Sequence, residues 1–485
     1  MIYRHPALAL LSALWIASCG EQKQTTPLHV YCAAALTAPL EELAKSYEQK
    51  FGVSINLQLG PSQTLLSNAE VTGLGDLYLP ADDSYITMAE KKNLISSTIP
   101  LATQTAVLVV KKGNPKQIAK LADLREMRLA IASPDATAIG SALKKTLPTD
   151  AWAQLFEKAT TVSTVNEAAN ALKSGAVDAT FIWDAMLTQY PEFQALEITE
   201  LAKTTANVSV ALLQKSGQPA AAMRFARFIA SSDLGLPVMA KHGLKVVQGD
   251  PWAEKPVIQV FAGSMLRPAI EQTLVEFEKR EGVEINRVYN GCGILVGQMK
   301  AGTTPDAYFA CDVEFMKQVS EQFEKPDDIA QNQLVILVQK GNPHGIADLK
   351  DLAKPNLRVG IGHEKQCAMG WLTQRTFTQG GVTDSVMKNV VAQVPTGDML
   401  VNSMLAGSLD AAVVYLSNSV GAGDKLDALA IQGIQCAIAT QPFAVKRGTP
   451  YKQVLERLHA TLRSTESQER FTEEGFTWNP AGKSE

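Results

Sequence analysis

"GDLYLPAD", residues 75–82, recurs with the same pattern as "PDAYFACD", residues 305–312. The longer stretches "FGVSINLQLGPSQTLL" from Phe51 and "EGVEINRVYNGCGILV" from Glu281 repeat with the same displacement of 230 positions. Further matching segments follow in the same order along both halves, which indicates a tandem duplication. Each repeat is about 220 residues long, within the size range of one domain.

The duplication sets the predicted domain organisation. We expect copy one of the repeat over residues 28–247 and copy two over residues 257–480. The linker, residues 248–256, lies within the segment "VVQGDPWAEKPV". Each copy is long enough to bury a hydrophobic core of its own.

Strand and helix patterns alternate in each copy. The apolar runs "LHVYCAAA" and "VIQVFAGS" both lead into a predicted helix, and in the first of these Leu40, Leu43 and Tyr47 fall three or four residues apart. A second strand, a second helix and a third strand follow. This βαβαβ order predicts an α/β fold with a mostly parallel sheet covered by helices. Ligands of such sheets bind at the loops that follow the carboxyl ends of the strands.

The amino terminus has the features of a signal peptide over residues 1–19, with an apolar run over residues 7–15. This run is shorter than the roughly 20 residues of a membrane-spanning helix. Residues 16–19 resemble the bacterial lipobox, which predicts cleavage and lipidation at Cys19; a plain cleavable signal with an incidental cysteine is the alternative. We expect residues 20–27 to form a tether, and the protein to be periplasmic or extracytoplasmic and lipid-anchored to a membrane.

Composition and motifs exclude several function classes. The net charge is −4, without a basic stripe or an acidic tail, so we expect no nucleic acid partner. The chain contains no CxxC pair, no nucleophile elbow and no HExxH motif. We therefore expect no enzymatic activity and no cofactor.

The strand-end loops resemble those of the periplasmic molybdate-binding proteins of ABC importers, which are type II solute-binding proteins. The matching loops are "AAALT" and "AGSML", "GPSQ" and "NGCG", "PAD" and "ACD", "ATAIG" and "QCAMG", and "DATFIW" and "DAAVVY". The resemblance implies two lobes and a hinge in each copy, with a small tetrahedral oxyanion held between the lobes. It also implies an ABC permease in the cytoplasmic membrane as partner.

Carried over loop by loop, the resemblance assigns five ligand-binding positions to each copy. In copy one they are Ala35, Ser62, Ala81, Thr137 and Trp183. In copy two they are Ser264, Cys292, Cys311, Cys367 and Tyr415. Copy one lacks the hydroxyl expected at position 35 and the tyrosine expected at position 183. Copy two is therefore expected to be the working site.

Three cysteines occupy successive ligand loops of copy two, and three interpretations are open. The thiols of Cys292, Cys311 and Cys367 replace a hydroxyl or a methyl group in an oxyanion site. Alternatively, two of them form a disulfide, as extracytoplasmic cysteines usually do. In the third interpretation the three are thiolate ligands for a soft metal such as Cu(I), for zinc, or for arsenite, with His363 as a further candidate ligand. The last interpretation predicts a metal-binding or sensory lipoprotein.

Overall fold

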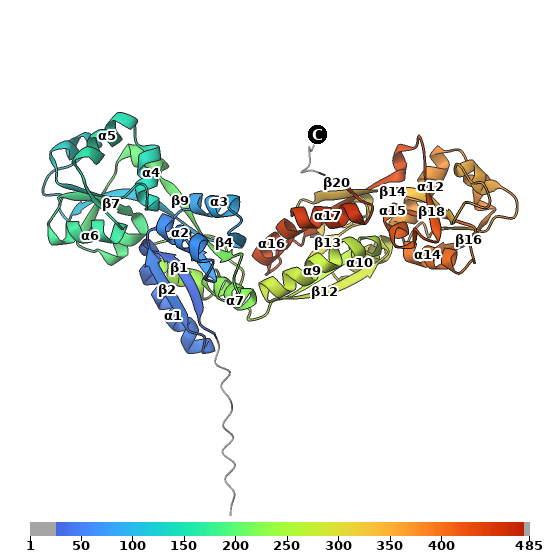
Figure 1. The fold of residues 1–485 in the computed structure, drawn as a ribbon, viewed down its shortest axis with the longest axis horizontal. Coiled ribbons are helices and arrows are strands. Elements are labelled where there is room, and N and C mark those ends of the chain that lie inside the picture. The colour runs from blue at the N-terminus through green and yellow to red at the C-terminus, as the bar shows by residue number, and fades with distance from the viewer. Residues whose placement is uncertain (1–25, 480–485) are drawn as a thin grey trace, which may run out of the picture.

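The computed structural model describes residues 26–479. It contains two α/β units in tandem, each with its own hydrophobic core, and these lie side by side in Figure 1. The α/β fold in two tandem copies is thereby confirmed. The predicted signal peptide, Cys19 and residues 20–25 of the predicted tether lie outside the described residues. Within residues 26–479, no helix is both long enough and apolar enough to span a bilayer.

The first unit alternates strands and helices. Its strands are β1 (Leu28–Ala33), β2 (Ile55–Gly60), β3 (Leu77–Leu79), β4 (Ile95–Lys111), β5 (Leu129–Ala132), β6 (Thr160–Val162), β7 (Ala179–Trp183), β8 (Phe193–Leu196), β9 (Thr205–Leu213) and β10 (Lys245–Val246). Its helices are α1 (Thr37–Phe51), α2 (Ser62–Thr72), α3 (Ser84–Lys91), α4 (Ala138–Thr146), α5 (Thr149–Lys158), α6 (Val165–Ser174), α7 (Pro219–Ile229) and α8 (Gly235–Lys241).

The second unit repeats this order. Its strands are β11 (Val257–Gly263), β12 (Glu284–Asn290), β13 (Ala307–Phe309), β14 (Asp327–Gln339), β15 (Val359–Gly362), β16 (Val390–Val394), β17 (Ala411–Tyr415), β18 (Leu426–Ala430), β19 (Ile438–Val445) and β20 (Thr477–Trp478). Its helices are α9 (Arg267–Glu281), α10 (Cys292–Lys300), α11 (Val313–Lys317), α12 (Ala368–Gln379), α13 (Thr383–Met387), α14 (Gly397–Leu405), α15 (Leu416–Ser419), α16 (Lys452–Leu462) and α17 (Thr465–Glu473).

The strand order is equivalent in the two units. It runs β2-β1-β3-β9-β4-β7-β5-β6 in the first and β12-β11-β13-β19-β14-β17-β15-β16 in the second. The sheets are mixed: β1 pairs in parallel with β2 and β3, and β5 with β6 and β7, whereas β4 and β9 run antiparallel to their neighbours. The duplication therefore preserves the complete topology.

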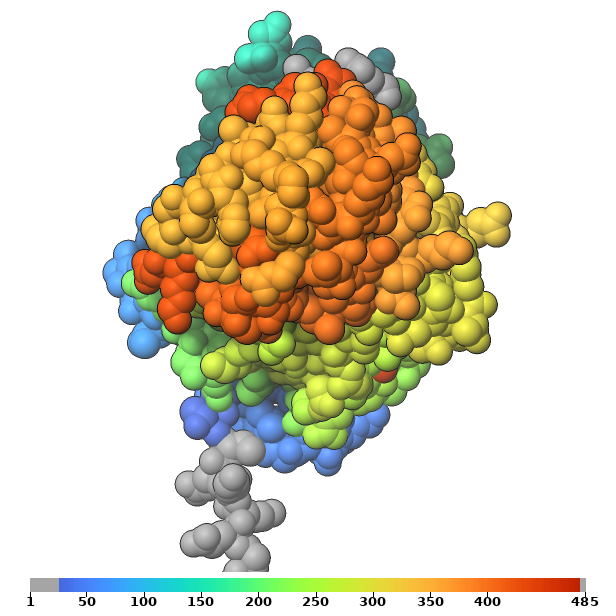
Figure 2. Space-filling model, turned by 90° about the vertical axis from the view of Figure 1, so that its right-hand side faces the viewer, coloured from blue at the N-terminus to red at the C-terminus, as the bar shows by residue number. Residues whose placement is uncertain are grey.

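One long strand joins the two lobes of each unit. In β4, residues 95–105 pair with β9 in the first lobe and residues 106–110 pair with β7 in the second lobe. In β14, residues 327–333 pair with β19 and residues 334–338 pair with β17. Figure 2, viewed from the side of copy two, shows the second lobe of that copy in orange in front of the rest of the molecule.

The first helix of copy one, α1, buries the apolar face that its sequence predicts. Leu40, Leu43 and Tyr47 of α1 are all buried, with at most 1% of their surface exposed. Gly52 then ends α1 with a φ of 67°, a left-handed conformation that glycine adopts without strain. Because β1 pairs in parallel with β2 and β3, the loop between β1 and α1 lies at the carboxyl end of these strands, beside the loops that follow β2 and β3.

Candidate functional site

Copy one contains a small cavity of about 20 Å³ at the carboxyl ends of its strands. All five positions predicted for this copy line the cavity: Ala35, Ser62, Ala81, Thr137 and Trp183. The first three belong to the lobe that contains β1, and the last two to the lobe that contains β7. The structure therefore brings together residues that are up to 148 positions apart in the sequence.

Three helices begin at this cavity. Ser62 is the first residue of α2, Thr137 is the N-cap of α4, and Thr164 is the N-cap of α6. The N-terminal end of each helix carries partial positive charge and backbone N–H groups without helical partners. None of the described residues that line the cavity has a charged side chain. An anion in this cavity would therefore meet backbone dipoles and hydroxyl groups rather than a basic side chain.

Thr164 and Val165 also line the cavity, although the sequence analysis did not select them. The Thr164 hydroxyl oxygen accepts the Glu167 N–H at 3.1 Å, and the Glu167 carboxylate accepts the Ser163 N–H at 2.9 Å. The pattern Thr-x-x-Glu before an apolar helix face is a capping signal, and it identifies the start of α6 from sequence alone.

Besides Thr164, whose hydroxyl also only accepts, Ser62 is the lining residue with a hydroxyl proton to offer. Its Oγ accepts the Ala81 N–H at 3.2 Å, and its carbonyl oxygen accepts the Tyr78 hydroxyl at 2.8 Å. Within residues 26–479 the Ser62 hydroxyl donates to no protein acceptor, so its proton is available to a ligand. Thr137 differs, because its hydroxyl donates to the Ser133 carbonyl at 2.7 Å and accepts the Gly140 N–H at 3.1 Å.

The remaining predicted positions of copy one form the walls of the cavity. Ala35 lies in the short 3-10 turn between β1 and α1, and Ala81 follows β3. Trp183 ends β7 and is 1% exposed, so it closes one side of the cavity with an apolar ring. Small residues at positions 35 and 81 let the backbone approach a ligand.

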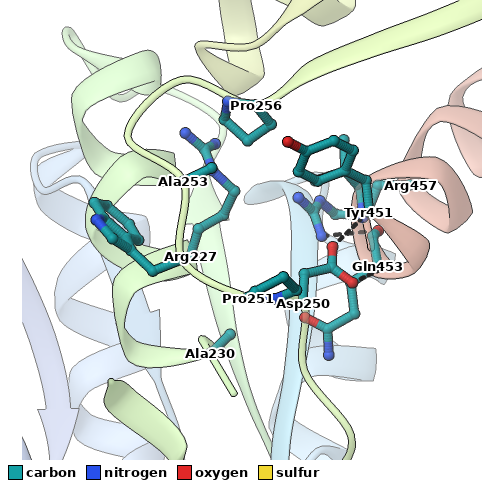
Figure 3. Close-up of a pocket in the computed structure, with 11 residues that line it drawn as sticks. Arg227, Ala230, Asp250, Pro251, Ala253, Pro256, Tyr451, Gln453 and Arg457 are labelled. Atoms are coloured by element: carbon teal, nitrogen blue, oxygen red, sulfur yellow. Dashed lines mark hydrogen bonds between the residues drawn. The ribbon is translucent and has the colours of Figure 1, made fainter. Parts of the chain in front are cut away.

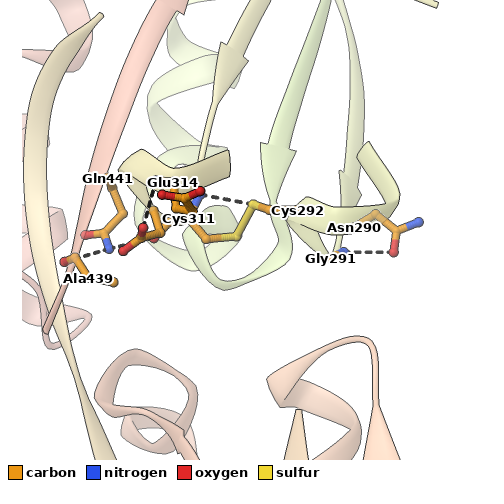
Figure 4. The surroundings of a disulfide bond; sticks show 8 residues. Asn290, Gly291, Cys292, Cys311, Glu314, Ala439 and Gln441 are labelled. Atoms are coloured by element: carbon orange, nitrogen blue, oxygen red, sulfur yellow. Dashed lines mark hydrogen bonds between the residues drawn. A yellow bond between two sulfur atoms is a disulfide. The ribbon is translucent and has the colours of Figure 1, made fainter. Parts of the chain in front are cut away.

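The equivalent loops of copy two contain a disulfide. Cys292, the first residue of α10, is bonded to Cys311, which follows β13 (Figure 4). The Cys311 N–H also contacts Cys292 Sγ at 3.0 Å, where copy one has the hydrogen bond from the Ala81 N–H to Ser62 Oγ. The disulfide interpretation is confirmed for this pair. A sulfur atom without a proton has thus replaced the free serine hydroxyl.

The structure corrects the three-thiolate hypothesis. Cys292 and Cys311 are joined to each other, so Cys367 is the one thiol left of the proposed metal ligands. Burial raises the pKa of Cys367 to about 11, so the thiol is neutral at the start of α12. His363 Nδ1 accepts the Lys365 N–H at 3.3 Å. In residues 26–479 no group of three His, Cys, Asp or Glu side chains is placed to hold a metal.

The two hydroxyl-bearing positions of copy two differ in burial. Tyr415 ends β17 and is 2% exposed, and its hydroxyl has no hydrogen-bond partner among the described residues. Burial raises the pKa of Tyr415 well above its ordinary value, so the hydroxyl stays protonated and can donate. Ser264 lies half-buried in the turn between β11 and α9. Copy two therefore presents two hydroxyls, a disulfide and a neutral thiol.

The lobes of both copies are in contact across their clefts. The Gln63 N–H in the first lobe of copy one donates to the Ala136 carbonyl in the second lobe at 3.0 Å. The Gly293 N–H of copy two donates to the Gln366 carbonyl at 3.1 Å, and both residues lie 230 positions after their counterparts. Both clefts are therefore closed in this structure.

Comparisons with known proteins follow the same division into two copies. A family model described as bacterial extracellular solute-binding protein matches residues 28–245 and 258–477. A binding protein of Haemophilus influenzae is 24% identical over 226 residues, which cover 45% of this chain and 90% of the relative. The Mycobacterium tuberculosis molybdate-binding protein ModA is 25% identical over 223 residues, which cover 45% of this chain and 84% of the relative.

Solved structures match over a similar length. The periplasmic molybdate-binding protein of Azotobacter vinelandii aligns with 17% identity and a TM-score of 0.40, covering 46% of this chain and 100% of the other. The relatives from Haemophilus influenzae and Mycobacterium tuberculosis therefore each correspond in length to one copy of the repeat.

Proposed function

Since the chain belongs to the bacterial extracellular solute-binding protein family, with two copies of the family domain, we propose that it captures a small tetrahedral oxyanion for an ABC importer. The family consists of binding proteins, which confirms the expectation that the chain is not an enzyme. Molybdate is the first candidate ligand, because relatives 25% identical to this chain are molybdate-binding proteins.

One observation carries the proposal: three helix N-termini and the free Ser62 hydroxyl meet at a cavity whose described lining has no charged side chain. A dianion without a basic side chain nearby needs a complete set of N–H and O–H donors, and helix N-termini supply them. A second lobe that contributes α4 and α6 adds donors when the cleft closes. Affinity then depends on contacts that exist only in the closed form.

The proposal places the oxyanion in copy one, and thereby differs from the expectation that copy two is the working site. Ser62 retains a hydroxyl proton, whereas the equivalent Cys292 has none while it is bonded to Cys311. Tyr415 and Ser264 leave copy two with donors of its own, so a second bound anion is compatible with the proposal.

The proposed role also includes the membrane anchor and the transport partner that the sequence predicts. The mature chain would be extracytoplasmic and held to a membrane by a lipid on Cys19, with residues 20–27 as tether. From there it would deliver the oxyanion to the permease of an ABC importer.

Calorimetric titration of the full chain with molybdate, and with sulfate as competitor, tests the function. Ser62→Ala should weaken molybdate binding about 10- to 100-fold, because a hydrogen bond to a charged ligand is lost. Ser264→Ala changes a serine in the first strand-end loop of copy two, the counterpart of Ala35, and as control it should leave the binding that depends on Ser62 unchanged. If Ser264→Ala alone lost molybdate binding, the site would lie in copy two. If the folded native chain released no heat on titration, oxyanion binding would be refuted.

A further inference from the structure

The joint between the two copies buries an unusual set of charges. Glu281, at the end of α9, is fully buried, and its Oε2 accepts Arg457 Nε at 3.0 Å and Nη2 at 2.9 Å. Its Oε1 accepts the hydroxyl of Ser97 in copy one at 3.0 Å and lies 3.4 Å from Arg280 Nε. Arg457 is 8% exposed and gives its remaining Nη1 to the Gln453 carbonyl at 2.9 Å. Apart from Arg280 Nε, which has no hydrogen-bond partner among the described residues, these groups satisfy one another.

The Arg227 side chain reaches this joint from α7 of copy one, and not all of its N–H donors have a hydrogen-bond partner. Its side chain is 8% exposed, and its Nη1 donates to the Glu281 carbonyl oxygen. Its Nε and Nη2 are buried and have no hydrogen-bond partner among the described residues. Leaving a buried charged group with unpaired donors costs several kcal/mol in general, so a partner for these two N–H groups is expected.

A cavity of about 10 Å³ lies beside these donors. Its lining includes Arg227 from copy one, Asp250 and Pro256 from the linker region, and Tyr451 from copy two. In Figure 3 the guanidinium group of Arg227 and the hydroxyl group of Tyr451 lie on either side of Pro256, and the hydroxyl is directed toward the Arg227 side. A space of this size holds one water-sized particle.

The Glu281 carboxylate is shared by three guanidinium groups, those of Arg227, Arg280 and Arg457, so positive charge is in excess around the cavity. The charge of Arg457 is balanced by the Glu281 carboxylate, at 2.9 Å. The Asp250 carboxylate, the one acidic side chain in the described lining, accepts the Gln453 N–H at 2.9 Å and the Val454 N–H at 3.1 Å, so it faces the positive end of α16. Burial lowers the pKa of Arg227 to about 10, which leaves it charged at neutral pH.

We propose that this cavity binds a single halide ion, chloride under natural conditions, between the Arg227 guanidinium and the Tyr451 hydroxyl. The ion neutralises Arg227 and accepts the unpaired Nε–H and Nη2–H groups. Because the lining comes from both copies and from the linker, the bound ion holds the two copies in one fixed relation. The site lies away from both clefts and is independent of the oxyanion proposal.

Crystals of the full chain grown or soaked in sodium bromide test the site directly, because bromide is located by its anomalous scattering. The expected result is an anomalous peak within hydrogen-bond distance of Arg227 Nε or Nη2. A non-anomalous water at this position, or an empty cavity, would overturn the proposal. The native chain is used, so the outcome does not depend on the folding of a variant.

Thermal unfolding provides the second test. At equal ionic strength, sodium chloride should raise the Tm by about 2 to 4 °C over sodium gluconate, whose anion is too large for the cavity. The chloride effect should vanish in Arg227→Met and persist in Arg224→Met, which removes a charge from the same helix at a half-buried arginine that is paired with the exposed Glu254. An equal chloride effect in both variants would show that chloride acts elsewhere, and the proposal would fail.

Discussion

The Gly293 N–H donates to the Gln366 carbonyl across the cleft of copy two, at the position where Gln63 donates to Ala136 in copy one. A β-carbon added at Gly293 would lie 2.0 Å from the Lys365 carbonyl oxygen, closer than such atoms can approach. Closure of copy two therefore depends on a glycine at this position.

Gly293→Ala should hold the second cleft open. The expected result is a loss of hydrogen-exchange protection of the amide at position 293 by at least about tenfold, because its acceptor lies on the opposite lobe. Gly297→Ala is the matched control, since a β-carbon there meets nothing within 4 Å and lies on the same helix. Unchanged protection at position 293 would mean that the loop yields and that closure tolerates the side chain.

Reduction of the Cys292–Cys311 disulfide should destabilise copy two alone. The bond closes a loop with a sequence separation of 19, for which the loss of the cross-link costs about 3 kcal/mol of unfolding free energy. Native-state hydrogen exchange of the amides in β11 and β13, with and without reductant, measures this loss. Copy one has no disulfide among its described residues, so β1 and β3 are internal controls.

A double variant extends this test. Cys292→Ser with Cys311→Ala reproduces the Ser62 and Ala81 pair of copy one, and its stability should not respond to reductant. If the native chain were equally indifferent to reductant, the two thiols would be unbonded in solution.

Asp312 should give copy two a distinct pH dependence. Burial raises the pKa of this carboxyl group from its ordinary value of 3.8 to about 6. The folded state then binds a proton that the unfolded state releases, so this residue's contribution to stability falls as pH rises from about 4 to about 6 and is constant above that.

Asp312→Asn should remove this slope, because an amide does not titrate. The difference in Tm between variant and native chain should therefore move in favour of the variant from pH 4 to pH 6. Asp82→Asn changes the equivalent residue of copy one, which is half-buried, and serves as control. The same trend in both variants would assign the effect to helix capping rather than to burial.

Most of the fold could be predicted from the sequence, because the duplication gives two independent sequence patterns for each strand and helix. The constant spacing between Ser62 and Cys292, and between Ala81 and Cys311, also predicted which residues would lie together at the strand ends. Topology alone carries this information, since parallel strands bring their carboxyl ends to one edge of a sheet.

What the sequence could not predict is which contacts those residues make. Five cysteines outside the signal segment permit many pairings, so a disulfide between two of Cys292, Cys311 and Cys367 was one of three interpretations, and the pair was not specified. Arg227 and Glu281 were not predicted to be buried, because charged residues on a helix are usually exposed on the surface. Their burial arises from packing between copies, which local periodicity does not encode.

The linker residue Asp250 also stabilises a helix of copy two. Its carboxylate accepts the N–H groups of Gln453 and Val454 and so caps α16, a helix that comes late in the sequence of copy two but lies beside copy one (Figure 1). Copy two cut free at Val257 would lose this cap, worth about 1 kcal/mol, and would expose the Glu281 and Arg457 pair to water. The second half of the chain is therefore completed by the first, and the two repeats, although they descend from one pattern, are no longer separable parts.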